Sequence, residues 1–173
     1  NLYKPMPGYR FIASNTDRSK YYVGELNGRS SKQAYMDALH ISESNIINQT
    51  FHNPIGKMNG QDICIISLKE VSGNGLCCYR QVNDSDVLVL LEEQDYNEIL
   101  DETLQRIRRD FNHISGVFSI NCVFRYLLFS QEHHMEDYLK TMSTLGDHAG
   151  LIGFGEHYNQ QFVNQTMTCV VFE

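Results

Sequence analysis

A strand and a helix follow each other directly in the stretch Asp86-Val-Leu-Val-Leu-Leu-Glu-Glu-Gln-Asp95. The apolar run is typical of a buried strand, because it is short and ends at two glutamates. Asp95 can then cap a helix from Tyr96 to Phe111, in which apolar residues recur at helical spacing while the other face is charged. This segment therefore predicts both kinds of secondary structure in one chain.

Further strand-like segments lie just before this stretch. Residues 62–68, 75–82 and 86–91 are rich in β-type residues and are separated by Gly and Asn. Gly73-Asn74-Gly75 suits a hairpin turn, because its residues tolerate the positive φ that tight turns require. The three segments together predict an antiparallel meander.

The first part of the chain also mixes strands with a helix. Residues 9–13 and 21–26 resemble two short strands around a polar loop. Ser30 or Ser31 can cap a helix over residues 32–39, since a serine hydroxyl accepts hydrogen bonds from the unpaired amides of a first turn.

The last part of the chain continues the same alternation. We expect a long strand over residues 117–129, then a helix over 132–144 that ends before Gly146. Strands over 149–154 and 166–172 follow, joined by the polar loop 155–165.

These elements predict an α+β fold, with an antiparallel or mixed sheet of about seven or eight strands and about three or four packed helices. The sequence shows no internal repeat or low-complexity linker. We therefore expect a single domain over residues 1–173, with residues 1–8 as a linker.

The composition excludes several classes of protein. The chain has 173 residues, and its net charge of −7 opposes binding to nucleic acid. No apolar stretch reaches the roughly 20 residues that cross a bilayer, so we expect no membrane contact. The five cysteines form an odd count without the dense spacing of a secreted disulfide scaffold, which indicates a cytoplasmic protein.

Standard catalytic and metal-binding motifs are absent. The sequence contains no GxSxG elbow, no phosphate loop ending in GK[ST], no HExxH, no CxxC pair and no EF-hand loop. His133 and His134 diverge around a helix axis, so they are poorly placed to share a metal ion. We expect neither an enzyme nor a metal site, although Cys122 or Cys169 could serve as a nucleophile with a His partner that is near only in space.

The segment Gly150-Leu-Ile-Gly-Phe-Gly-Glu156 is the most unusual part of the sequence. Its glycines permit close approach of a backbone or a ligand, and Glu156 places a carboxylate at the end of an apolar strand. Arg125 interrupts another apolar segment, where a charge requires a partner. Glu156 either binds an amine or guanidinium of a ligand, or pairs internally with Arg125 or with backbone amides.

Several segments form a recognisable series along the chain. In order they are Glu25-Leu-Asn-Gly28, Ala34-Tyr35, Cys122-Val-Phe-Arg125, the helix that contains Met135, Gly153-Phe-Gly-Glu156 and Asn164-Gln-Thr166. This series resembles the C-terminal domain of the FIST family, whose name derives from F-box and intracellular signal transduction proteins.

The resemblance implies a sensory domain of a larger signalling protein. Its implied partners are a FIST N-terminal domain, an output domain and a small ligand such as an amino acid. Arg125 and Glu156 would hold the opposite charges of a zwitterion. The expected ligand-binding residues are Cys122, Arg125, Gly153, Gly155, Glu156, Asn164 and Thr166.

Two other functions stay open at this point. The first is an interaction or dimerisation domain, which would form a homodimer through an exposed apolar patch. The second is a haem-based gas sensor, because some family members resemble such sensors; its iron ligand would be His52, His113, His148 or His157. Apart from haem, no cofactor is expected.

Overall fold

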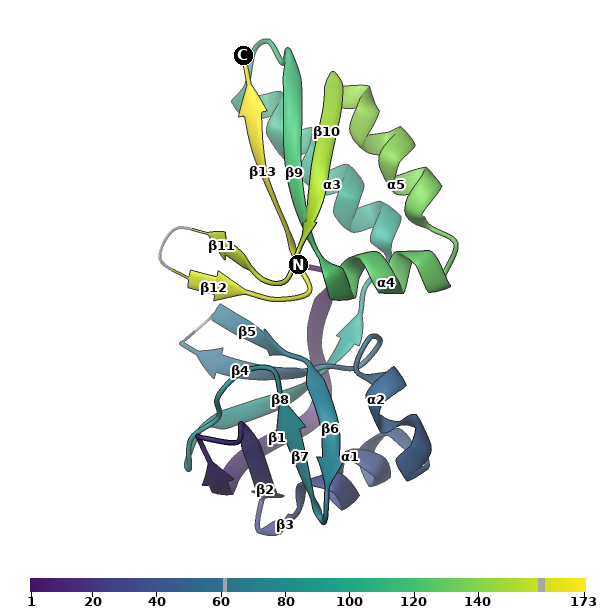
Figure 1. Cartoon of the computed structure of the whole chain (residues 1–173). Helices are drawn as coiled ribbons and strands as arrows, with labels where there is room; N and C mark the ends of the chain where they lie inside the picture. Colours follow the sequence, from purple (N-terminus) through teal and green to yellow (C-terminus); the bar gives the residue numbers. More distant parts are fainter. Residues whose placement is uncertain (61, 159–160) are drawn as a thin grey trace. The chain divides into compact units, whose positions relative to one another are not determined.

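The computed structural model covers the whole chain and describes residues 1–60, 62–158 and 161–173. The chain divides into two compact units (Figure 1). The N-terminal unit is Tyr3–Glu93, and the C-terminal unit is Gln94–Glu173 together with Asn1–Leu2. Both units combine helices with strands, which confirms the predicted α+β class. That the whole chain is one domain stays a prediction.

The N-terminal unit is built on a curved antiparallel sheet. Its strands follow the order β5-β4-β8-β1-β2-β7-β6, with β3 paired to β2, which confirms the predicted size of the sheet. The elements are β1 (Tyr3–Asp17), β2 (Tyr22–Leu26), β3 (Arg29–Ser30), α1 (Ser31–Leu39), η1 (Glu43–Asn45), α2 (Ile46–Gln49), β4 (Ile55–Asn59), β5 (Asp62–Ile66), β6 (Leu68–Ser72), β7 (Gly75–Cys78) and β8 (Val87–Glu93).

The predicted meander of three consecutive strands is wrong. Strand β5 pairs with β4, and β8 lies between β4 and β1, so only β6 and β7 form the expected hairpin around Gly73. The segment contains an additional strand, β6, that the sequence pattern did not separate from β5. Alternation of apolar and polar residues predicts that a segment is a strand, but it does not predict which strand pairs with it.

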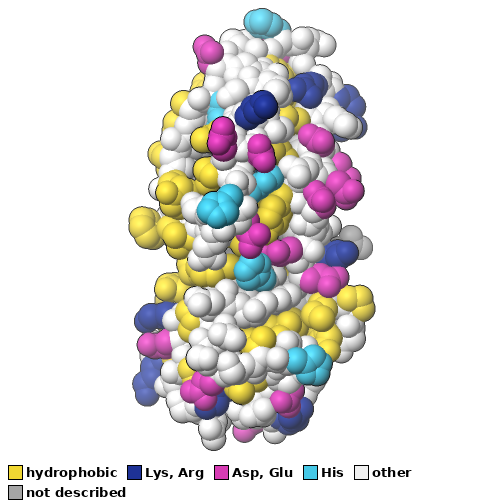
Figure 2. Space-filling model, turned by 90° about the vertical axis from the view of Figure 1, so that its right-hand side faces the viewer, with side chains coloured by type: hydrophobic (Ala, Val, Ile, Leu, Met, Phe, Trp, Pro, Cys, Tyr) yellow, Lys and Arg dark blue, Asp and Glu magenta, His cyan; other side chains and the backbone are white. Residues whose placement is uncertain are grey.

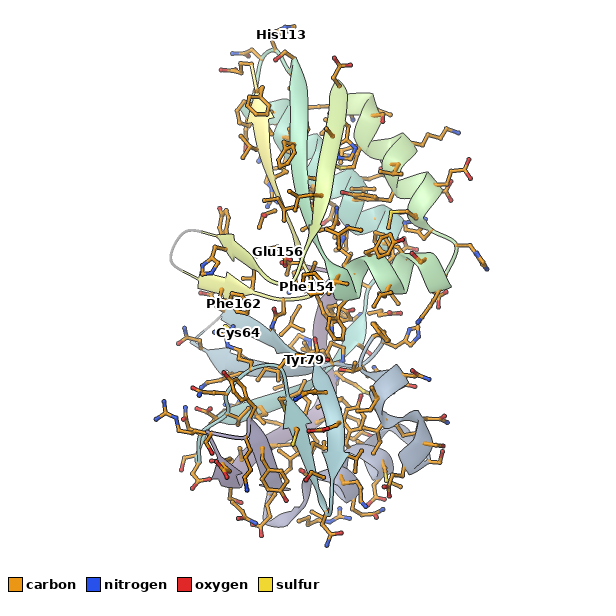
Figure 3. All side chains as sticks on the ribbon, in the orientation of Figure 1. Cys64, Tyr79, His113, Phe154, Glu156 and Phe162 are labelled. Carbon is orange, nitrogen blue, oxygen red and sulfur yellow. The ribbon has the colours of Figure 1, made fainter. Side chains whose placement is uncertain are left out.

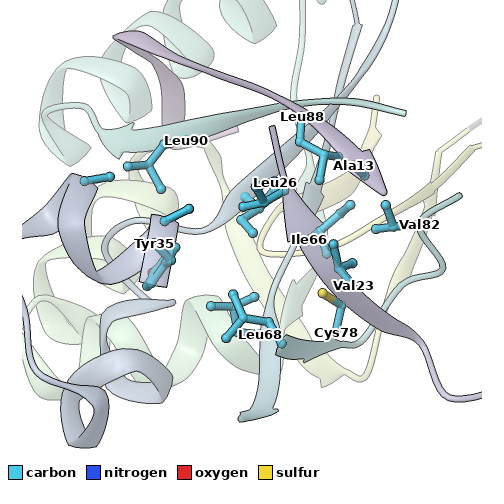
Figure 4. Packing of buried hydrophobic residues seen from close by; sticks show 14 of the residues in the cluster. Ala13, Val23, Leu26, Tyr35, Ile66, Leu68, Cys78, Val82, Leu88 and Leu90 are labelled. Carbon is cyan, nitrogen blue, oxygen red and sulfur yellow. The ribbon is translucent and has the colours of Figure 1, made fainter. Parts of the chain in front are cut away.

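The core of the N-terminal unit lies between this sheet and helix α1 (Figure 4). Leu88 and Leu90 of β8 belong to this core, and Val89 and Leu91 on the other face of the strand are buried as well. Tyr35 of α1 is also buried in this core, and its hydroxyl donates to the carbonyl of Asn53 at 2.7 Å. Helix α1 begins as predicted, because the Ser30 hydroxyl accepts from the Gln33 amide.

The first residues are part of strand β1 rather than a linker. Tyr3 pairs with Glu93 and Pro5 with Leu91 of β8. The register then shifts before Arg10, at a bulge where Gly8 adopts a φ of +86°. A bulge tolerates the prolines of this segment, which cannot donate to a regular ladder.

The C-terminal unit contains a small mixed sheet with helices on one side (Figure 1). In the order β10-β9-β13, strand β10 is parallel to β9 and β13 is antiparallel to it, while β11 and β12 form a separate hairpin. The elements are α3 (Tyr96–Asp110), β9 (Gly116–Cys122), α4 (Val123–Gln131), α5 (Met135–Met142), η2 (Ser143–Leu145), β10 (Asp147–Gly153), β11 (Glu156–Tyr158), β12 (Gln161–Val163) and β13 (Met167–Phe172).

Two predicted elements of this unit need correction. The strand predicted over 117–129 ends at Cys122, and residues 123–131 form helix α4, because the connection to a parallel strand requires a helical crossover. The polar loop predicted over 155–165 contains the β11–β12 hairpin, and its positions 159 and 160 lie outside the described residues. The helix predicted over 132–144 is confirmed as α5 and η2.

The surface carries dispersed charges. On the face shown in Figure 2, acidic and basic side chains lie among each other and are interrupted by apolar ones. None of the described helices combines the length and the apolar character that crossing a bilayer requires.

The cap of helix α3 supports a first prediction. The Asp95 carboxylate accepts from the amides of Asn97 and Glu98 at 2.8 and 3.1 Å. Asp95→Ala should lower the free energy of unfolding by about 1 kcal/mol, measured by urea denaturation. Asp101→Ala, an exposed control within the same helix, should change it by less than about 0.5 kcal/mol. Equal effects of the two substitutions would contradict the capping role.

Candidate functional site

The parallel pair β9–β10 brings several predicted site residues together. Cys122 ends β9 and pairs in register with Gly153 at the end of β10. Cys122 also precedes the first turn of helix α4, and its amide donates to the carbonyl of Thr166 at 3.0 Å. The carboxyl ends of parallel strands, next to a helix N-terminus, are a recurrent place for ligands in α/β sheets.

Glu156 is buried at this end of the sheet (Figure 3). Only 2% of its surface is exposed, and its Oε2 accepts from the Thr166 hydroxyl at 3.1 Å. Its Oε1 accepts no hydrogen bond from the described residues. Burial raises the pKa of the carboxyl, while the Thr166 hydroxyl, the Cys122 thiol and nearby backbone amides oppose this shift. Glu156 therefore offers a buried acceptor atom that a ligand can use.

Glycine at position 153 leaves room beside this carboxyl. A Cβ on Gly153 would lie 3.6 Å from Glu156 Oε1, in ordinary contact. Gly155 has a different role, because its φ is +132° and a Cβ there would collide with the Phe162 ring. Gly155 therefore shapes the turn into β11. Asn164 is buried, as its predicted place in a site requires.

Arg125 lies in helix α4, not in the predicted strand. The side chain is buried, and its guanidinium lies 4.6 Å from the ring centre of Phe129 and 5.5 Å from that of Tyr138. Aromatic faces stabilise a cation in such positions. That Arg125 and Glu156 bind opposite charges of one ligand stays a prediction.

Thr166 also lines a cavity of about 550 Å³ between α3 and β13. Arg106 and Asp110 of α3 contribute charged groups to its wall, although the sequence predicts a solvated, charged face for this helix. The other lining residues are Asn1, Thr103, Ile107, Tyr158, Val163, Met167, Thr168 and Cys169.

A second cavity, of about 270 Å³, lies between β10 and α5. Its residues with polar side-chain groups are Ser119, Asn121, Tyr126, Tyr138 and His148, of which only His148 was expected near a pocket from the sequence. Ser119 and Asn121 are polar residues on the buried face of β9, and this is the signal that could have located the cavity.

The other histidines do not gather around one point. His157 packs on the Phe162 ring in the β11–β12 hairpin, and His52 is 3.1 Å from Glu93 in the N-terminal unit. His113 lies at the opposite end of the C-terminal sheet from Glu156 (Figure 3). Across residues 1–60, 62–158 and 161–173, no group of three or more His, Cys, Asp or Glu side chains is arranged to hold a metal ion.

The model of the FIST C domain family matches residues 32–159. The chain belongs to the FIST C domain family. The match begins in the N-terminal unit and ends in the C-terminal unit, so the family domain includes parts of both. It confirms the resemblance seen in the sequence and associates the chain with signal transduction. No curated protein and no solved structure matches this FIST C domain.

Burial determines the expected reactivity of Cys122. It raises the pKa of the thiol, Glu156 acts in the same direction, and backbone amides of the first turn of α4 oppose them. In the folded protein at neutral pH, iodoacetamide should leave Cys122 unmodified, and urea should make it reactive. Peptide mass spectrometry measures both states. Rapid modification of folded Cys122 would instead favour a catalytic thiol.

The raised pKa of Glu156 predicts a dependence of stability on pH. Above its ordinary pKa of 4.5, the unfolded chain loses this proton more readily than the folded chain. Stability therefore falls as the pH rises, until the folded carboxyl has also ionised. Glu156→Gln removes this loss.

The advantage of Glu156→Gln over the unsubstituted protein should thus grow with pH from 4.5 upward and then level off, measured by urea unfolding across the range. Glu136→Gln, at an exposed position in α5, serves as the control and should show no such trend. A constant difference between Glu156→Gln and the unsubstituted protein would show that the carboxyl ionises equally in both states.

Proposed function

We propose that this FIST C domain is the ligand-binding input domain of a larger cytoplasmic signalling protein, and that it is not an enzyme. The observation that carries the proposal is the buried Glu156, whose Oε1 has no hydrogen-bond donor among the described residues. An unsatisfied buried carboxyl oxygen costs free energy, and a ligand that donates to it recovers that cost.

The adjoining cavity gives the ligand its second contact. Thr166 joins the Glu156 carboxyl to the cavity of about 550 Å³, where Arg106 lies on the wall. In this arrangement a ligand amine donates to Glu156, and a ligand carboxylate binds Arg106 or, as the sequence motif implies, Arg125. A free amino acid carries both groups. No cofactor is required for this recognition.

Binding at this point can be transmitted through the unit. The ligand would contact residues at the end of β10 and the start of β13, both of which pair with β9. Ligand binding would favour the ordered state of these segments over other states of the unit. A FIST N-terminal domain or an output domain that binds this state preferentially can then respond to the ligand. The proposal therefore needs no large rearrangement within the sheet.

Thermal denaturation in the presence of free amino acids tests the proposal. A ligand at about 100 times its dissociation constant stabilises the protein by about 2.7 kcal/mol. We expect one class of amino acid to raise the melting temperature, and Glu156→Gln to weaken its binding by about tenfold or more. Glu136→Gln is the matched control and should bind normally. The absence of a shift with every amino acid would overturn the proposal.

Arg106→Gln and Arg125→Gln identify the carboxylate contact. If the cavity wall supplies it, Arg106→Gln weakens amino acid binding, whereas the amine analogue that lacks a carboxylate binds both proteins equally. If Arg125 supplies the contact, Arg125→Gln weakens amino acid binding instead and leaves binding of the amine analogue unchanged. Calorimetric titration of the two variants measures both affinities.

A second candidate function is self-association through the face of the sheet opposite the helices. Leu151, Val170 and Phe172 lie on this face and are each about half exposed. An apolar surface of this kind can bind a second copy of the chain. Sedimentation velocity at increasing concentration should then show dimers, and Val170→Lys should dissociate them. A monomer at every concentration would exclude this candidate.

A further inference from the structure

The cavity between β10 and α5 contains a chain of hydrogen bonds. The Asn121 amide nitrogen donates to the Tyr138 hydroxyl at 2.8 Å, and that hydroxyl donates to Ser119 Oγ at 3.3 Å. Ser119 Oγ lies 2.9 Å from His148 Nε2. The chain links three separate elements, β9, α5 and β10, and fixes the orientation of each polar side chain around the cavity.

One end of this chain is incomplete. Asn121 is only 8% exposed, and its Oδ1 has no hydrogen-bond partner among the described residues. Because the amide nitrogen of Asn121 is held by Tyr138, the oxygen has a defined position. A buried carbonyl oxygen without a donor is unfavourable, so this atom favours a bound molecule that carries an N–H or O–H group.

The cavity carries no formal charge. Among the residues that the structure describes, its wall contains no Lys, Arg, Asp or Glu. Burial lowers the pKa of His148, which keeps the imidazole neutral at neutral pH. Arg125 does not line the cavity, and its guanidinium lies over the rings of Phe129 and Tyr138. Since an ion buried here would lack a counter-charge, the cavity selects a neutral molecule.

Apolar residues form the remaining wall and the mouth. Met135 and Leu139 contribute from α5, and Leu151 and Ile152 from β10. Leu139 and Ile152 are 47% and 44% exposed, and Ile152 pairs in register with Asn121, so a molecule in the cavity would cover apolar surface that now faces solvent. At about 270 Å³, the cavity exceeds the roughly 150 Å³ of an engineered apolar cavity that holds benzene. A fused two-ring molecule is of suitable size.

We propose that this cavity is a second ligand site, independent of Glu156, which takes a small neutral molecule with a hydrogen-bond donor on an aromatic body. The donor binds Asn121 Oδ1, and the rings lie between Leu139 and Ile152. The two sites of the C-terminal unit would therefore accept different chemistry, a zwitterion at Glu156 and a neutral ring compound here.

Three related probes test the chemistry of the site. Indole has a neutral ring system with an N–H donor, 1-methylindole lacks the donor, and indole-3-carboxylate adds a negative charge. We expect indole to give saturable shifts of the Asn121 side-chain amide and of residues 149–152 in ¹H–¹⁵N spectra of the full chain. The other two compounds should have dissociation constants at least about tenfold higher than that of indole.

Two variants test the location. Leu139→Trp fills the mouth from an exposed position and should abolish the shifts without unfolding the protein. Asn121→Leu removes the acceptor and should weaken indole about tenfold, while the amino acid response at Glu156 persists. Ser130→Ala, an exposed position on α4, is the control and should bind normally.

Either of two results would overturn the proposal. Equal binding of indole and 1-methylindole would show that Asn121 Oδ1 does not select a donor. No saturable shift with any probe would show that the cavity holds only water. Neither result would affect the amino acid site, because that site is measured with different compounds and the Glu156→Gln variant.

Discussion

The parallel pairing of β9 with β10 is the constraint on which the C-terminal unit depends. Two parallel neighbours cannot be joined by a tight turn, so helices α4 and α5 provide the crossover. The same pairing aligns Cys122 with Gly153 and places Glu156 directly beyond the strand ends. It also leaves β10 at one edge, beside α5, and β13 at the other, beside α3, where the two cavities lie.

Local signals in the sequence were sufficient to predict much of the fold. Ser30 and Asp95 cap the helices that their positions indicated, and the turn at Gly73 forms the expected hairpin. The failures arose where the decisive contact is distant in sequence. Residues 123–129 are apolar apart from Arg125 and Tyr126, so neither period is clear, and the crossover to a parallel strand makes them helical. The partner of β8 likewise depends on the whole sheet.

The candidate site could be predicted only in part for the same reason. The glycine segment and the family motif located Cys122, Gly153, Glu156 and Thr166, which are close together in space. The role of Arg125 was harder to predict, because aromatic rings as well as anions can stabilise a buried cation. Ser119 and Tyr138 became neighbours only through folding, and no spacing rule connects residues on a strand and a later helix.

The division of the chain has a consequence for protein engineering. Residues 1–2 cluster with the C-terminal unit, and the N-terminal unit runs from Tyr3 to Glu93. The Gln94 amide donates to the Leu2 carbonyl at 2.9 Å, and Tyr3 pairs with Glu93, so the two ends of the N-terminal unit are adjacent. Domains with adjacent ends are readily transplanted or circularly permuted. The adjacent ends of Tyr3–Glu93 therefore give this unit the geometry that exchange for another domain requires, through junctions at residues 2–3 and 93–94.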